Sequence, residues 1–144
     1  MDVQYDDTEM LKRLLVGREI VRVDKDIKRF DEWSGRNMAV ISFTLDNGVV
    51  LEARETGGGC SCSNGCWSVA NNAIPEGVIM NVEIEETDPE TGEPVRRDDE
   101  WAIIRMFVMD DLGNRVPLIE SEGGDNGYYG WGYELHIRLS EGVG

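Results

Sequence analysis

The chain has 144 residues, and its 29 acidic and 14 basic side chains give a formal net charge of −15. This charge disfavours direct binding to nucleic acid or to an anionic membrane, because both require cations that neutralise phosphates. No apolar run approaches the ~20 residues of a membrane-spanning helix, and the acidic first residues lack the pattern of a secretory signal. We therefore expect one soluble, cytoplasmic domain over residues 1–144. Basic proteins are its natural electrostatic partners, or the high net charge serves only to keep the protein soluble.

One short helix is expected near the start of the chain. Asp7 or Thr8 is suited to begin it, because both side chains accept hydrogen bonds from first-turn N–H groups. The helix would run from Glu9 to Val16 and end before Gly17, a residue type that often follows a helix. Three leucines recur at helical spacing and predict one apolar face that docks on a sheet: Leu11, Leu14 and Leu15.

The residues after this helix indicate strands. A first strand is expected at Arg18–Asp24, followed by a polar loop over 25–37 in which Phe30 and Trp33 are candidate anchors. The clearest element is a hairpin around Asp46-Asn47-Gly48, because Asn and Gly tolerate the positive φ of its turn. The inward-facing residues of this hairpin are expected to be Ala39, Ile41, Phe43, Leu45, Val49, Leu51 and Ala53.

Four more strands are expected, at 78–84, 101–109, 116–120 and 133–139. The 101–109 segment is apolar at nearly every position, which predicts a central strand covered on both faces. In the last segment we expect Tyr133, Leu135, Ile137 and Leu139 to face inward. The polar residues 87–100 are predicted to be a mobile acidic excursion. Together these elements predict a mainly β (α+β) domain of about seven strands, in a curled antiparallel sheet or small barrel with one N-terminal helix.

A glycine-rich loop carries the three cysteines, Cys60, Cys62 and Cys66. Thiolates prefer soft metals, so zinc is the cofactor that such a loop would bind. The single histidine, His136, would complete the site only if the loop folds onto the polar face of the last strand. The C-x-C-x3-C spacing differs from the paired C-x2-C motifs of zinc ribbons. The alternatives are that no cofactor binds and the thiols pack as small apolar groups, or that the thiols carry redox chemistry.

Two other segments are candidates for binding. Tyr128, Tyr129 and Trp131 alternate with glycines, so these aromatic rings either form a recognition patch or cap one end of the sheet. Glu83 and Glu85 belong to an acidic stretch, and strand residues two apart lie about 7 Å apart on one face. Phosphates along one DNA strand are about 7 Å apart. Such a surface would imitate DNA and occupy a DNA-binding protein, or it is simply a solvated acidic face.

The order of these features resembles an uncharacterised domain family that is frequent in actinobacteriophage genomes. The matching segments are Leu15–Val23, Leu45–Leu51, Cys60–Trp67 and the Asn-Gly-Tyr-Tyr-Gly of Asn126–Gly130. The cysteines of that family are often adjacent, whereas Ser61 separates Cys60 from Cys62 here, and Cys66 is additional. The resemblance implies a phage or prophage setting and supplies no activity.

No catalytic constellation stands out in the sequence. A nucleophilic Cys–His pair is disfavoured, because the acidic surroundings oppose formation of a thiolate. Our leading interpretation is therefore a non-enzymatic phage accessory protein that binds a basic or nucleic-acid-binding host protein in the host cytoplasm, as an inhibitor. A virion structural or decoration protein is the second interpretation, and a metal-binding protein built on the cysteine loop is the third. An exposed strand edge would also allow a homodimer.

Overall fold

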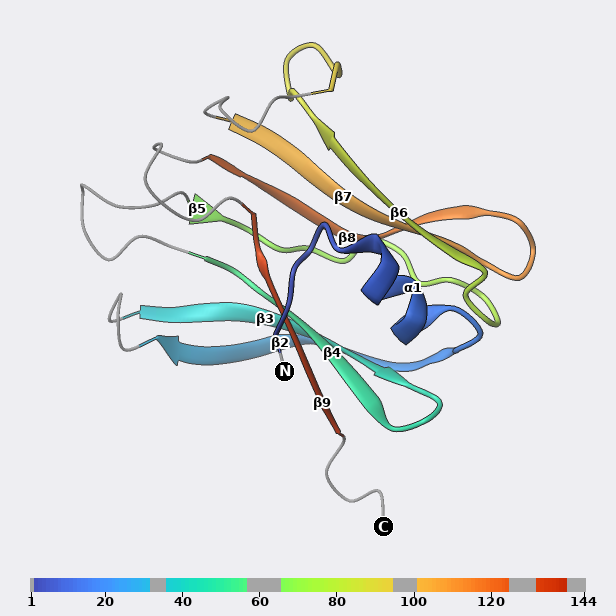
Figure 1. Ribbon diagram of the computed structural model, residues 1–144. Helices are drawn as coiled ribbons and strands as arrows, with labels where there is room; N and C mark the ends of the chain where they lie inside the picture. The colour runs from blue at the N-terminus through green and yellow to red at the C-terminus, as the bar shows by residue number, and fades with distance from the viewer. Residues whose placement is uncertain (1, 32–35, 57–65, 95–100, 125–131, 140–144) are drawn as a thin grey trace.

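The computed structural model describes residues 2–31, 36–56, 66–94, 101–124 and 132–139. Its strands form two antiparallel sheets, one above the other in Figure 1. The first sheet has the order β1 (Asp2–Val3), β9 (Glu134–Leu139), β4 (Val49–Arg54), β3 (Arg36–Leu45) and β2 (Ile20–Asp31). The second has the order β5 (Cys66–Trp67), β8 (Arg115–Gly124), β7 (Trp101–Met109) and β6 (Asn81–Thr87). The predicted mainly β class with one N-terminal helix is confirmed, and the described strands close no barrel.

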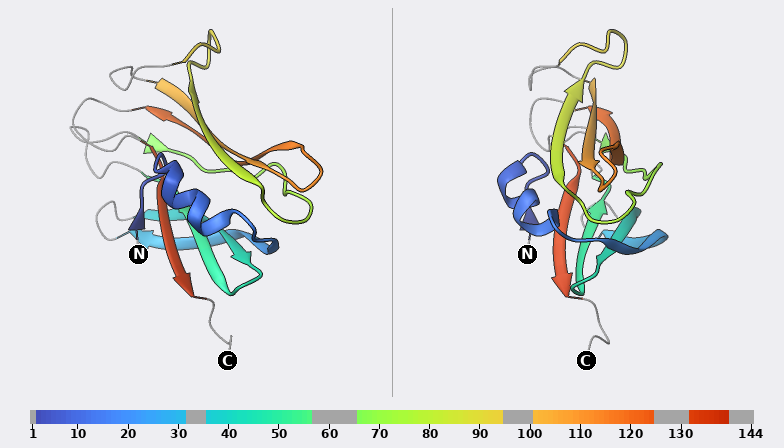
Figure 2. Two further views of the ribbon diagram at one scale, coloured as in Figure 1. Left: turned by 45° about the vertical axis from the view of Figure 1, so that its right-hand side comes forward. Right: turned by 90° about the vertical axis from the view of Figure 1, so that its right-hand side faces the viewer.

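The helix α1 (Thr8–Leu15) covers the open side between the two sheets, beside β6 (Figure 2). An Asp7 carboxylate oxygen accepts a 3.1 Å hydrogen bond from the backbone N–H of Met10, which confirms the predicted start. Leu11 and Leu15 are fully buried, so the predicted apolar face does dock on the core. No helix in the described part of the chain is long and apolar enough to cross a bilayer.

The predicted hairpin is the β3–β4 pair. Its turn closes with a 3.0 Å hydrogen bond from the Gly48 N–H to the Leu45 carbonyl, and Gly48 has a φ of +85°. Phe43 pairs with Leu51 across the two strands, and both side chains are fully buried. The alternation of the sequence therefore placed this hairpin correctly on the core.

The predicted loop over 25–37 is wrong. β2 continues to Asp31 and β3 already begins at Arg36, with Arg29 opposite Met38 in the register. Phe30, expected as an anchor, is 65% exposed, and Trp33 lies outside the described residues. The prediction failed because β2 is the edge strand of its sheet. β3 supplies the backbone hydrogen-bond partners of β2, and most side chains of β2 stay in solvent, so a polar sequence can form this strand.

Two further expectations fail at the margins of the core. β7 does lie between β6 and β8, but only its even-numbered residues are buried. Its odd-numbered residues form a half-exposed outer face, and Trp101 is 49% exposed. Leu139 is 75% exposed rather than inward, because it is the last residue of β9 and lies beyond the core.

The core lies between the two sheets and under α1. Both sheets contribute apolar side chains from the faces that look toward each other, and the helix adds its leucines. The largest fully buried residues include Leu11, Leu15, Phe43, Leu51, Trp67, Ile104, Met106, Leu118 and Leu135. Two outer sheet faces are left, one on each side of the molecule, and the candidate sites lie on them and at the β1–β9 edge.

The segment predicted to be an acidic excursion begins with a hydrogen-bonded turn. The N–H of Asp88 donates to the Glu93 carbonyl, and an Asp88 carboxylate oxygen accepts from the N–H groups of Glu90 and Thr91. Thr87 and Pro94 form a bridge at the base of this turn. Residues 95–100 lie outside the described part of the chain.

Candidate binding sites

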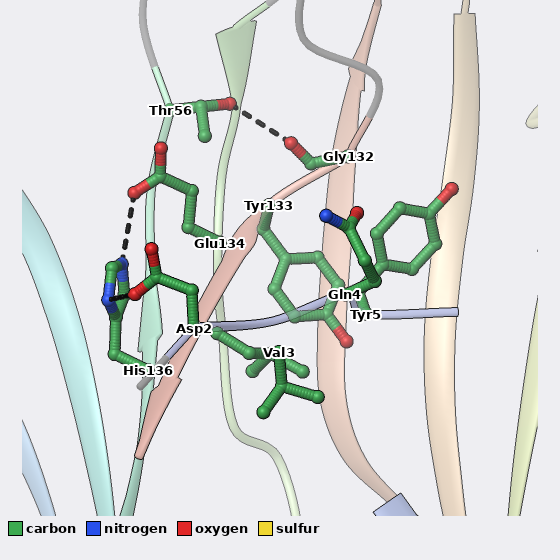
Figure 3. Close-up of a pocket in the computed structure, with 10 residues that line it drawn as sticks. Asp2, Val3, Gln4, Tyr5, Thr56, Gly132, Tyr133, Glu134 and His136 are labelled. Atoms are coloured by element: carbon green, nitrogen blue, oxygen red, sulfur yellow. Dashed lines mark hydrogen bonds and ion pairs between the residues drawn. The ribbon is translucent and has the colours of Figure 1, made fainter. Parts of the chain in front are cut away.

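His136 lies on the outward face of β9, between two carboxylates (Figure 3). Its Nδ1 is 2.5 Å from an Asp2 carboxylate oxygen, and its Nε2 is 3.2 Å from one of Glu134. The contact to Asp2 follows from the register, because Asp2 on β1 is the direct partner of His136. The predicted position of His136, on the same face as Glu134 and Arg138, is therefore correct, and two acidic neighbours already occupy its ring nitrogens.

The predicted zinc site depends on residues that the structure does not describe. Cys60 and Cys62 lie outside the described ranges. Only the backbone of Cys66 is described, in β5, where it pairs with Gly124 of β8. Among the described side chains, no group of three or more His, Cys, Asp or Glu is arranged to hold a metal ion. Zinc binding by Cys60, Cys62, Cys66 and His136 stays a prediction.

A pocket of about 250 Å³ adjoins His136, with two tyrosines on its inner side (Figure 3). The rings of Tyr5 and Tyr133 are 5.5 Å apart, and the Tyr5 hydroxyl donates a 2.8 Å hydrogen bond to Glu86. Gly132 has a φ of +88°, and a Cβ at this position would collide with the Tyr5 ring. Burial raises the pKa of the Tyr133 phenol far above its usual value, so this group stays protonated and is unsuited to proton transfer.

The predicted recognition residues divide into two groups. Tyr128, Tyr129 and Trp131 lie outside the described residues. Glu83 and Glu85 lie together on the outer face of β6, as their alternation predicts, and both bind one cation. Arg115 donates to Glu83 at 3.0 Å and to Glu85 at 3.1 Å. These glutamates are thus partly neutralised rather than free acids.

Arg115 also lies flat on an aromatic ring: its guanidinium carbon is 3.6 Å from the centroid of Phe107. Partial desolvation would lower the pKa of Arg115, but the hydrogen bonds to Glu85 and Glu83 raise it. Arg115 is therefore a fixed cation that bridges β6 and β8 above the central strand β7. Sequence spacing had indicated the two glutamates but not the arginine that holds them.

The same outer face carries further paired charges around apolar side chains. Arg105 lies 3.4 Å from Glu120, and the indole N–H of Trp101 donates a 3.1 Å hydrogen bond to Glu122. Half-exposed apolar residues of β7 lie between these pairs. We call this surface the acidic–aromatic face: Glu83, Glu85, Trp101, Ile103, Arg105, Phe107, Met109, Arg115, Glu120 and Glu122.

A second charged group, on the outer face of the first sheet, was not anticipated. Glu52 on β4 is completely buried, and three arginines on β2, β4 and β9 bind its carboxylate. Arg29 and Arg138 contact one oxygen at 2.9 and 2.6 Å. Arg54 contacts the other with two nitrogens, at 3.3 and 3.0 Å. We call these four residues the Glu52 cluster.

The arginines determine the protonation state of Glu52. Burial alone would raise its pKa, but the hydrogen bonds from Arg138, Arg54 and Arg29 outweigh desolvation and lower the pKa to about 2. The carboxylate is thus ionised at any ordinary pH. The sequence carries one weak signal of this arrangement, a glutamate inside the apolar segment Val49–Ala53. Arg54 is close to Glu52 in the chain, but Arg29 and Arg138 could not be assigned to it because they are 23 and 86 residues away.

Comparison with known proteins identifies a family. The chain belongs to the family described as a domain of unknown function, DUF7448, whose model matches residues 13–135. The expectation of an uncharacterised domain family is therefore confirmed. A search of curated proteins and a search of solved structures each found no match.

Proposed function

We propose that this protein is a phage accessory protein that binds a host protein through the acidic–aromatic face. The supporting observation is the composition of that face. Its charged groups are paired with one another, and they surround half-exposed Phe107 and Met109 and the exposed Trp101. Aromatic residues and methionine enclosed by a polar rim are typical of the centre of a protein interface. The phage setting rests on the sequence resemblance.

The charge of the face supports a basic partner. Four glutamates stand against two arginines there, and the whole chain carries −15. Such a surplus steers a basic protein toward the face and raises the rate of association at low salt. If the partner is a nucleic-acid-binding protein, occupation of its basic surface would exclude nucleic acid. That competition is the inhibitory mechanism that we propose.

Trp101→Ala tests this proposal, with Phe30→Ala as its matched control. Both aromatic side chains are exposed, Trp101 on the acidic–aromatic face and Phe30 on β2 of the other sheet. We expect immobilised wild-type protein to capture a basic host protein from a bacterial lysate. Trp101→Ala should weaken the purified complex about 30-fold, the effect of losing a hot-spot residue worth about 2 kcal/mol. Phe30→Ala should leave the affinity unchanged.

The charge requirement can be tested on the same complex. Glu120→Lys and Glu122→Lys should slow association, and added salt should weaken the wild-type complex. Equal binding by wild type and Trp101→Ala would contradict the proposed face. A partner that belongs to the phage particle instead of the host would contradict the accessory role and favour the virion interpretation.

A further inference from the structure

The outer face of the first sheet contains a shallow groove of about 780 Å³ above the Glu52 cluster. Its polar lining comes from three strands: Arg22, Asp24 and Arg29 on β2, Ser42 and Thr44 on β3, and Arg138 on β9. This face lies on the opposite side of the core from the acidic–aromatic face. The groove is therefore independent of the protein-binding surface proposed above.

The charges in this groove do not cancel. Arg22 pairs with Asp24 at 2.9 Å, so these two groups neutralise each other. Glu52 carries one negative charge and binds Arg29, Arg54 and Arg138. One guanidinium is enough to neutralise one carboxylate, and Arg54 alone contacts Glu52 with two nitrogens. The cluster therefore retains two positive charges, in a chain whose overall charge is −15.

Arg29 and Arg138 have guanidinium N–H donors that do not bind Glu52. Each uses a single nitrogen on the same Glu52 oxygen, at 2.9 and 2.6 Å, so those two nitrogens lie within the sum of these distances, 5.5 Å, of each other. A guanidinium has five N–H donors. The others of Arg29 and Arg138 make no hydrogen bond to any described residue, and these side chains are 46% and 43% exposed.

We propose that this groove binds a phosphate group, held between the guanidiniums of Arg29 and Arg138, with the Thr44 hydroxyl as a further donor. The two surplus positive charges match a dianion, and arginine donors suit the geometry of phosphate oxygens. Glu52 acts as the positioning residue, because it anchors both guanidiniums before the ligand arrives, which reduces the entropy lost on binding. The ligand is either free phosphate or a small phosphate monoester.

Titration of the full-length protein with sodium phosphate tests the site, with the arginine Nε–Hε NMR signals as the readout. A sodium chloride series at equal ionic strength serves as the reference. We expect saturable shifts of the Arg29 and Arg138 signals with phosphate and none with chloride. Arg138→Gln should weaken phosphate binding at least tenfold. Arg115→Gln, which removes a guanidinium already shared by two glutamates on the other sheet, should leave it unchanged.

A parallel titration with phenyl phosphate separates the two ligand sources. Tighter binding than phosphate would assign the site to a monoester, and equal or weaker binding would assign it to free phosphate; both results support the phosphate site. If thermal unfolding shows that Arg138→Gln is not folded, Arg29→Gln provides the same test. The proposal is overturned if neither anion gives saturable shifts, if chloride gives equal shifts, or if the arginine variant binds as tightly as wild type.

Discussion

The two outer sheet faces of this molecule arrange the same residue types in opposite ways. On the first sheet three arginines surround one glutamate, and the glutamate is completely buried. On the second sheet two glutamates surround one arginine, and all three side chains are 40–46% exposed. The comparison indicates that burial, rather than the number of ion pairs, decides how much a charged cluster contributes to the free energy of unfolding. A desolvated carboxylate depends on its partners, whereas solvated groups can exchange theirs for water.

Glu52→Gln should produce the largest effect. The change keeps the shape of the side chain but removes the charge that holds three guanidiniums together. We expect the free energy of unfolding to fall by about 3–5 kcal/mol, the range found when a buried ion pair loses one partner. Urea denaturation would measure this loss, provided that the dependence of the free energy of unfolding on urea concentration is the same in both proteins. A loss below about 1 kcal/mol would show that the Glu52 cluster behaves like an ordinary surface pair.

Acid should lower the free energy of unfolding because it protonates the same carboxylate, Glu52. The pKa of Glu52 is about 2 in the folded protein, against an ordinary value of 4.5 for a solvated glutamate. The unfolded state therefore binds more protons between these values, and stability falls as the pH drops through this window. The wild-type advantage over Glu52→Gln should be constant above pH 4.5 and shrink by about 3 kcal/mol toward pH 2. The other carboxylates titrate in both proteins, so a pH-independent difference would contradict the low pKa.

Gly132→Ala compares the packing around the two sheets. Gly132 has a φ of +88°, and a Cβ added there would collide with the Tyr5 ring, whereas Gly113 in the β7–β8 turn has a φ of +86° and open space where a Cβ would lie. Gly113→Ala carries only the backbone cost, about 1 kcal/mol. Gly132→Ala adds a steric clash and should cost about 2–4 kcal/mol in all. If Gly132→Ala and Gly113→Ala lower the melting temperature equally, the Tyr5 ring moves aside easily.

Arg115→Gln should have the smallest effect on stability. It removes two half-exposed ion pairs and the contact with Phe107, which together are worth about 1 kcal/mol or less. The loss should decrease further at high salt, because exposed charges are screened. Urea denaturation at two salt concentrations would measure it. A loss as large as that of Glu52→Gln would remove the contrast between the two faces.

Much of the fold could be predicted because it depends on short-range patterns. The helix followed from Asp7 and its leucines, and the hairpin from Asn47-Gly48 between alternating strands. The errors came where a neighbour in space overrides the local pattern. Residues 25–31 read as a loop, yet β3 pairs with them and makes them a strand. The odd-numbered residues of β7 read as buried, yet nothing in the described chain covers them fully.

Local sequence patterns predicted the class of the domain, its helix, its central hairpin and the outward positions of Glu83, Glu85 and His136. These features depend on backbone preferences and on the two-residue period of a strand, which a few neighbouring residues set. Which charged side chains meet depends instead on long-range packing. Arg29, Glu52 and Arg138 come from three strands, and their contact depends on the order β9-β4-β3-β2 and on the register of each pair. That order is a property of the whole packed sheet, and no short segment specifies it.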